Sequence, residues 1–228
     1  MRIAVMQPYL FPYLGYFQLI RSCDEFVLYD DVQYKKHSWV NRNCLLLAGK
    51  RHRFTVPVLG ASLTKTFNDV RFDNRESVLT TIRYAYAKAP HFGSVFPILV
   101  NIFEYSDRTV AAFIRNSLTE ILRYIGISRR LTMSSDLAIA PSFRGQPRVL
   151  EICRLKEATE YVNSTGGKAL YDPQEFSEAG ISLRFLHPDR VEYNQFGGPF
   201  IDNLSIIDVL MFNEPSLVAH YTDRFSLS

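Results

Sequence analysis

The chain has 228 residues, of which 47% are hydrophobic and 21% charged, a composition typical of folded globular proteins rather than disordered ones. The net charge of +3 is too small to predict non-specific nucleic-acid binding, and no apolar run reaches the ~18 residues that cross a bilayer. Because no leader pattern begins the chain and no Cys-x-x-Cys pair occurs, we expect a cytoplasmic protein with reduced thiols at Cys23, Cys44 and Cys153 and no structural zinc.

Two short apolar runs near the N-terminus predict strands that are buried on both faces of a parallel sheet. They cover residues 2–6 and 25–29, and the segment between them has the apolar spacing of a helix that begins near Pro12 or Tyr13. This segment is long enough for the crossover that joins two parallel strands.

The middle of the chain predicts a hairpin followed by helices. The hairpin covers residues 43–58, with its turn at the Ala-Gly-Lys sequence in the middle. A helical section then covers about residues 75–126, is broken at Pro90 and Asp107, and ends at Gly126.

After this section, strands and helices alternate, which again indicates a parallel sheet. The predicted strands are residues 130–137, 159–164 and 181–187. The predicted helices are residues 148–158, 172–180 and, last in the chain, 203–213. The sequence therefore predicts one α/β domain over residues 1–228, with a mostly parallel central sheet and a helical middle section.

The loop after the first strand is the first candidate for a binding site, because ligands of open parallel sheets bind beyond the carboxyl ends of the strands. The loop is rich in proline and aromatic residues, and it begins with Gln7. The helix that follows it presents free N–H groups to an anion. Gly15 either permits close approach of a ligand or only lets the helix pack on the sheet.

Asp30 and Asp31 follow the second predicted strand, and Gln33 lies just beyond them. Carboxylates in this place bind ribose hydroxyls or a divalent metal, or they cap a local turn. Two adjacent acids repel each other unless cations offset them, so we expect Lys35, Lys36 and Arg42 nearby.

The next stretch combines a planar cation, two amides and the only tryptophan of the chain. Arg42 is suited to grip phosphate, and Trp39 to stack on a sugar or base. His37 is a candidate general base, although a lone histidine beside lysines more often lies on the surface. The candidate ligand-binding residues of this stretch are Lys36, Trp39, Asn41, Arg42 and Asn43.

A second polar and aromatic concentration lies near the C-terminus. Tyr193, Gln195 and Ser205 are candidates to line the same crevice, and Asp208 follows Ser205 at the spacing of a capping box. A plain turn followed by a capped helix explains this stretch almost as well. The sequence STGGKALY at residues 164–171 is similar to a phosphate-binding turn, but it lacks the full P-loop spacing.

Six short motifs follow one another along the chain, at residues 7–17, 30–34, 39–43, 56–58, 193–195 and 204–208. In this order they resemble the WbqC-like family, and the resemblance covers essentially the whole chain. His37 lies outside the pattern. The resemblance implies a protein of bacterial O-antigen and related polysaccharide clusters, for which a glycine (aminoacyl) transferase role has been proposed.

The opening strand, loop and helix also resemble the start of the nucleotidylyltransferase superfamily. That motif has histidines where this chain has Tyr13 and Tyr16, and the resemblance implies that the two tyrosine hydroxyls donate hydrogen bonds to a phosphate. The analogy implies a Rossmann-like or nucleotidylyltransferase-like fold more strongly than it implies adenylyl transfer.

We therefore expect a transferase that joins an amino sugar, in nucleotide-linked form, to a small acyl group such as glycine. Asp30 or Asp31 would orient or deprotonate the amine, and Arg42 and Lys36 would hold phosphate. Gln7 and Asn41 would bind the sugar or the carbonyl, and Trp39 would stack. The alternatives are an ATP-dependent adenylating ligase or nucleotidylyltransferase, and a non-catalytic protein that binds sugars or partner enzymes. The acyl donor, the cofactor and the oligomeric state stay open.

Overall fold

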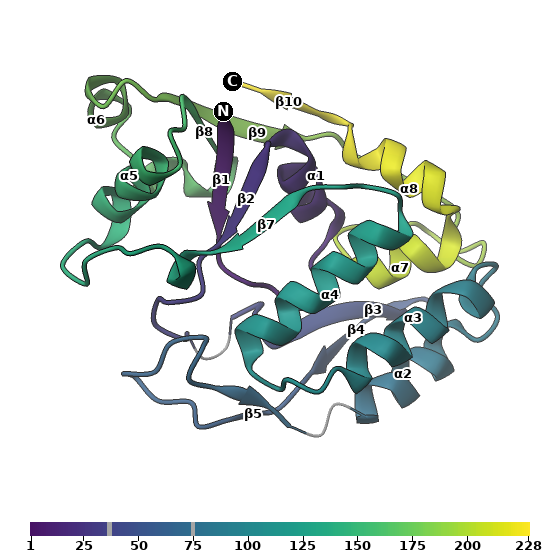
Figure 1. Ribbon diagram of the computed structural model, residues 1–228. Coiled ribbons are helices and arrows are strands. Elements are labelled where there is room, and N and C mark those ends of the chain that lie inside the picture. The colour runs from purple at the N-terminus through teal and green to yellow at the C-terminus, as the bar shows by residue number, and fades with distance from the viewer. Residues whose placement is uncertain (36–37, 74–75) are drawn as a thin grey trace.

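The computed structural model describes residues 1–35, 38–73 and 76–228. At its centre lies a six-stranded sheet in the order β10-β9-β8-β1-β2-β7 (Figure 1). The strands are β1 (Arg2–Met6), β2 (Glu25–Leu28), β7 (Arg130–Met133), β8 (Glu160–Ser164), β9 (Ser182–Pro188) and β10 (Phe225–Leu227). All pairs are parallel except β9 with β10. The predicted α/β class with a mostly parallel sheet is confirmed.

The apolar runs of β1 and β2 form strands because both of their faces are covered. Ile3 and Val27 contribute to one hydrophobic cluster, and Ala4 and Phe26 to the other. The first predicted strand has the observed limits, and the second ends one residue early. The length predicted for the strand at 130–137 is wrong. The strand ends at Met133, and the chain continues as the 3-10 turn η1 (Ser134–Asp136).

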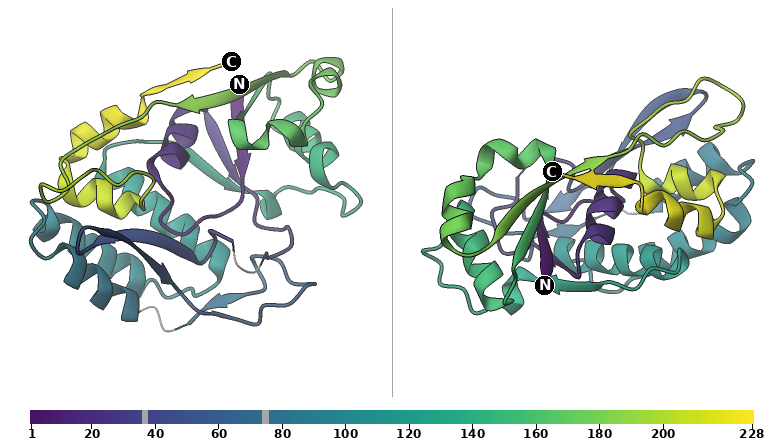
Figure 2. Two further views of the ribbon diagram at one scale, coloured as in Figure 1. Left: turned by 180° about the vertical axis from the view of Figure 1, so that it is seen from behind. Right: turned by 90° about the horizontal axis from the view of Figure 1, so that it is seen from above.

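Helices cover the sheet on both faces (Figures 1 and 2). On one face lie α5 (Gly145–Leu155) and α6 (Pro173–Glu178), whose apolar side chains share a cluster with β1 and β2. On the other face lies α1 (Leu14–Ser22), which packs against α8 (Pro215–Thr222). The 3-10 turn η2 (Thr165–Leu170) follows β8.

The helical middle section belongs to a single long connection between β2 and β7. This connection begins with a hairpin of β3 (Arg42–Leu47) and β4 (Lys50–Thr55). A short antiparallel pair of β5 (Val58–Leu59) and β6 (Arg71–Phe72) follows. The helices are α2 (Glu76–Tyr86), α3 (Phe92–Glu104) and α4 (Val110–Tyr124). The predicted hairpin and helices are confirmed, and one hydrophobic cluster joins them to the α1 face of the sheet. Within the described residues, no helix combines the length and apolar character needed to span a membrane.

The end of the chain departs from its prediction. The helix α7 (Ile206–Phe212) has Ser205 as its N-cap, but it is not the last element. Pro215 begins α8, because proline fits the first turn of a helix, and β10 then pairs antiparallel with β9. The two chain ends consequently lie close together at one end of the molecule (Figures 1 and 2).

Candidate functional site

A cleft with a volume of ≈ 610 Å³ lies at the carboxyl ends of β1 and β8. The chain leaves β1 toward β2 on one side, whereas β8 pairs on the other side, so the direction of winding reverses between these two strands. Open α/β sheets bind ligands at such a point. We call this cavity the switch-point cleft. Its aromatic wall includes Tyr9, Tyr13, Tyr29, Trp39 and Tyr171, and its polar lining includes Gln7, Gln146, Asn163 and Ser164.

The opening loop is held in place by side chains from distant parts of the chain. The Asn43 Nδ2 atom donates hydrogen bonds to the carbonyl oxygens of Leu10 and Phe11 at 3.0 and 2.7 Å, and Ser205 Oγ donates to the Phe11 carbonyl at 2.8 Å. Phe11 has a φ of 42°, a strained conformation for a residue other than glycine. Asn43 and Ser205 therefore hold the loop in shape, and Ser205 is fully buried.

The other predicted residues of the loop line the switch-point cleft. The buried Tyr16 hydroxyl donates to the Gln7 carbonyl at 2.8 Å, and burial raises the Tyr16 pKa well above its ordinary value. The side-chain amide of Gln7 has no hydrogen bond to any described residue, so it is available to a ligand. Tyr13 covers Gly15 so closely that a Cβ atom there would lie 2.4 Å from the Tyr13 ring. Gly15 thus allows Tyr13 to form the cleft wall.

Trp39 lies at the edge of the cleft with half of its surface exposed (50%). Its carbonyl oxygen accepts a hydrogen bond from the Leu10 amide at 3.3 Å, which ties it to the opening loop. An exposed indole beside a cavity that also presents amide groups is suited to stack on a planar ring or a sugar.

Asp30 is fully buried, and its carboxylate is occupied by the protein. It accepts hydrogen bonds from Ser134 Oγ, from the Ser135 amide and hydroxyl, and from Asn68 Nδ2, at 2.6 to 3.0 Å. These donors come from η1 and from the segment before β6. Asp30 therefore joins β2, the turn after β7 and the middle section.

Asp31 forms an ion pair with Arg148 of α5, and its carboxylate also lies within hydrogen-bond distance of Ser134 Oγ, whose single hydrogen is shared between Asp30 and Asp31. The Arg148 side chain is 8% exposed and its guanidinium lies over the Tyr29 ring at 5.9 Å. The sequence places the offsetting cation among Lys35, Lys36 and Arg42, whereas the structure shows an ion pair with Arg148 of α5; Lys36 lies outside the described residues.

Three predicted residues have other surroundings. Gln33 donates to the Leu63 carbonyl and tethers the loop before β6. Asn41 is buried and donates to the Val56 carbonyl at 2.9 Å, while Arg42 begins β3 opposite Thr55. None of these three residues is among the described residues that line the switch-point cleft. Lys36 and His37 lie outside the described residues.

Tyr193 and Gln195 meet at the buried carboxylate of Asp208. Asp208 accepts hydrogen bonds from the hydroxyls of Tyr193 and Tyr86, both at 2.7 Å, and from Gln195 Nε2 at 2.6 Å. Burial raises the pKa of Asp208, although these hydrogen bonds oppose the shift. Asp208 does not complete the predicted capping box, because its carboxylate faces this cluster. Tyr193 also lines a smaller cavity of ≈ 240 Å³ that shares Tyr13 with the switch-point cleft.

The wall of the cleft that follows β8 is not among the site residues predicted from the sequence. Asn163, Gly166, Gly167 and Tyr171 all line the cavity, together with Gln146 of α5. A Cβ atom at Gly167 would lie 3.1 Å from Asn163 Oδ1, so glycine allows the turn to pack on this amide. Its signal in the sequence is the Gly-Gly pair shortly after a predicted strand, although the spacing of a P-loop is incomplete.

The described residues contain no group of three or more His, Cys, Asp or Glu side chains placed to hold a metal ion. The three cysteines are free, as predicted, and all three are buried. Burial raises the pKa of the Cys23 and Cys153 thiols to about 12, so neither is suited to act as a nucleophile.

Comparisons with known proteins agree with the motif pattern. The family model described as "WbqC-like protein family" matches residues 7–220. The uncharacterized protein Rv1507c of Mycobacterium tuberculosis is 31% identical over 218 residues, which cover 93% of each chain. No solved structure gives a significant match.

Proposed function

Because the chain belongs to the WbqC-like protein family, we propose that it is a cytoplasmic transferase that acts on a nucleotide-linked amino sugar in the synthesis of O-antigen or a related surface polysaccharide. The reaction joins the sugar amine to a small acyl or aminoacyl group such as glycine. The nitrogen forms a bond with the acyl carbon, the bond between this carbon and its donor breaks, and the departing donor group takes the bonding electron pair and the proton that the nitrogen loses.

The observation that carries this proposal is the position and size of the switch-point cleft. Its volume of ≈ 610 Å³ falls in the range of ~300–1,000 Å³ typical of small-molecule sites. Numbered along the chain, the parallel strands lie in the order 3-2-1-4-5. This order supports a Rossmann-like or nucleotidylyltransferase-like fold, in which nucleotides bind at the same crevice.

The lining residues have the chemistry that such a substrate needs. Trp39 offers a stacking surface, and Gln7 offers an amide that can bind sugar hydroxyls. Gly15 and Gly166 keep side chains away from two parts of the wall. Asp30 and Asp31 have no proton-accepting role in this proposal, because their carboxylates are already engaged by the protein.

Binding is best measured through Trp39, since it is the only tryptophan of the chain and lies at the cleft. We expect its fluorescence to change on titration with at least one nucleotide-linked amino sugar, with a dissociation constant below about 1 mM. Trp39→Phe, measured by calorimetry, should weaken binding about tenfold. Tyr84→Ala is the matched control, because Tyr84 is exposed on α2 and does not line the cleft. Absence of binding by every nucleotide sugar would overturn the proposal.

The reaction type needs a second assay. The strand order also suits an ATP-dependent adenylating ligase or nucleotidylyltransferase, which would release pyrophosphate from a nucleoside triphosphate. We expect amide formation on the amino sugar without pyrophosphate release. Pyrophosphate release by the transfer-competent protein would favour the adenylating reaction, and binding without any product would favour a non-catalytic protein.

A further inference from the structure

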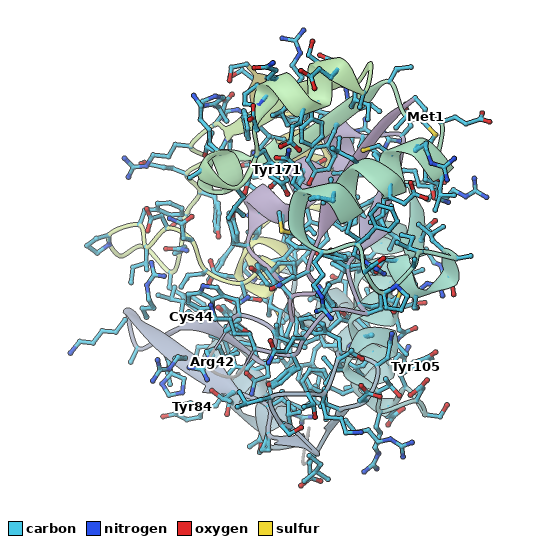
Figure 3. All side chains as sticks on the ribbon, turned by 90° about the vertical axis from the view of Figure 1, so that its left-hand side faces the viewer. Met1, Arg42, Cys44, Tyr84, Tyr105 and Tyr171 are labelled. Carbon is cyan, nitrogen blue, oxygen red and sulfur yellow. The ribbon has the colours of Figure 1, made fainter. Side chains whose placement is uncertain are left out.

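Three polar side chains at the wall of the switch-point cleft are hydrogen-bonded to one another, and two of them line the cleft. Asn163 Nδ2 donates to the hydroxyls of both Tyr161 and Tyr171 at 2.8 Å, and the two hydroxyls lie 2.9 Å apart. Tyr161 is fully buried, whereas Tyr171 is half-buried and lines the cleft. Tyr171 lies on the side of the molecule that carries α5 and α6, next to the sheet (Figure 3).

The direction of the hydrogen bond between the two tyrosines follows from counting donors. Both amide hydrogens of Asn163 are used, one on each hydroxyl oxygen. Within the described part of the chain, Tyr161 has no other acceptor than the Tyr171 oxygen, and an unpaired buried hydroxyl is costly. Tyr161 must therefore donate to Tyr171. The Tyr171 oxygen then accepts two hydrogen bonds, and its own hydrogen has no acceptor in the described protein.

We infer that Tyr171 directs its hydroxyl hydrogen into the switch-point cleft and donates it to an oxygen atom of the bound ligand. The identity of this ligand, a nucleotide-linked sugar, rests on the proposed function. The acceptor oxygen belongs to the sugar or to the phosphate. Oxygen atoms of both groups have lone pairs that can accept the hydrogen bond, and Tyr171 supplies the hydrogen. Tyr171 thereby selects ligands that have an acceptor at this point of the wall.

The pKa values of the two phenols follow from this arrangement. Burial raises the pKa of Tyr161 well above its ordinary value and the bond to Tyr171 raises it further, whereas the bond from Asn163 acts to lower it. Burial also raises the pKa of Tyr171, but the hydrogen bonds from Tyr161 and Asn163 act to lower it. Of the two hydroxyls, Tyr171 therefore has the more readily donated proton.

Two matched variants test the inference by calorimetry with the nucleotide sugar that binds the wild type. Tyr171→Phe keeps the ring, which packs on Tyr161 and Phe176, but it removes the donor, so affinity should fall about tenfold. Tyr161→Phe disturbs the same group but leaves the Tyr171 hydrogen free to bind, so affinity should stay within about threefold. An equal loss in both variants would overturn the inference, because it would show a structural role only.

The unlinked nucleoside diphosphate locates the acceptor. If Tyr171→Phe weakens it as much as the nucleotide sugar, the oxygen lies on the phosphate. If only the nucleotide sugar is weakened, the oxygen lies on the sugar. Either result supports donation by Tyr171, and unchanged affinity for both ligands contradicts it.

A measurement without ligand separates this inference from the proposed function. In a mixture of H₂O and D₂O, a slowly exchanging hydroxyl splits the NMR signal of the tyrosine carbon that carries it. We expect two signals for Tyr161, whose hydrogen is buried and hydrogen-bonded, and one signal for Tyr171. The Tyr161→Phe variant assigns the signals, because those of Tyr161 disappear in it. Slow exchange at Tyr171 and fast exchange at Tyr161 would overturn the inference even if no nucleotide sugar binds.

Discussion

Polar side chains lie beyond the carboxyl ends of two neighbouring pairs of strands. The two groups differ in whether the protein itself supplies their hydrogen-bond and ion-pair partners. Beyond β2 and β7, the protein itself supplies four hydrogen bonds to Asp30 and an arginine to Asp31. Beyond β1 and β8, Gln7 and Tyr171 keep hydrogen-bonding capacity that no described residue uses. The position of a polar residue at a strand end is therefore a weaker indication of a binding site than its unused hydrogen-bonding capacity.

The strongest test of this contrast is Asp30→Asn. The variant places an NH₂ group among donors that need an acceptor, so we expect the free energy of unfolding to fall by about 3 kcal/mol and the melting temperature by roughly 10 °C. The control is Glu104→Gln, which removes an exposed acid and should change the free energy of unfolding by less than ~0.5 kcal/mol. Normal melting of Asp30→Asn with loss of product formation would instead place this carboxylate in the functional site.

Asp31→Asn should have the next largest effect. The variant leaves the Arg148 guanidinium without its counter-ion, which we expect to cost about 2 kcal/mol, less than for a fully buried pair because Asp31 keeps some exposure. Chemical denaturation of a double-mutant cycle provides the control. Arg148→Met in the Asp31→Asn background should restore part of the lost stability, and additive losses would show that the pair is not coupled.

At the other pair of strand ends, Gly15→Ala should affect binding rather than stability. The new Cβ atom would lie 2.4 Å from the Tyr13 ring and push it into the switch-point cleft. We expect about tenfold weaker binding of the nucleotide sugar, and a melting temperature equal to or above that of the wild type, because alanine favours helices. Gly93→Ala, which has open space at the start of α3, is the matched control and should bind normally. Normal binding by Gly15→Ala would remove Tyr13 from the ligand site.

The smallest expected effect concerns the opposite end of β2, where Glu25 meets Lys156, Thr132 and Arg130. Burial acts to raise the pKa of Glu25, but these partners outweigh it and lower the pKa below 4.5. The unfolded chain therefore takes up this proton first, so the stabilisation is present above about pH 4.5 and is lost as the pH falls through the folded-state pKa. Glu25→Gln should flatten the dependence of stability on pH below about pH 4.5. An unchanged slope would show that Glu25 is not paired in solution.

The sequence predicts the local elements well, because apolar runs and helical spacing are properties of short segments. The strand at 2–6, the hairpin of β3 and β4 and the helices of the middle section are examples. It cannot predict that Arg148 meets Asp31, or that Asn43 and Ser205 hold the opening loop, since these contacts join residues far apart in the chain. It also does not predict β10, because an edge strand of three residues has too little pattern to recognise.

The bond from Ser205 to the Phe11 carbonyl joins residues 194 positions apart, and this has a consequence for the time at which the site forms. During synthesis on the ribosome, the first strand and the opening loop emerge long before α7 exists. The strained loop then lacks one of the groups that hold it, and the wall after β8 is also still missing. A nascent chain therefore carries no complete switch-point cleft, and the binding that we propose has to wait until nearly the entire polypeptide has been made.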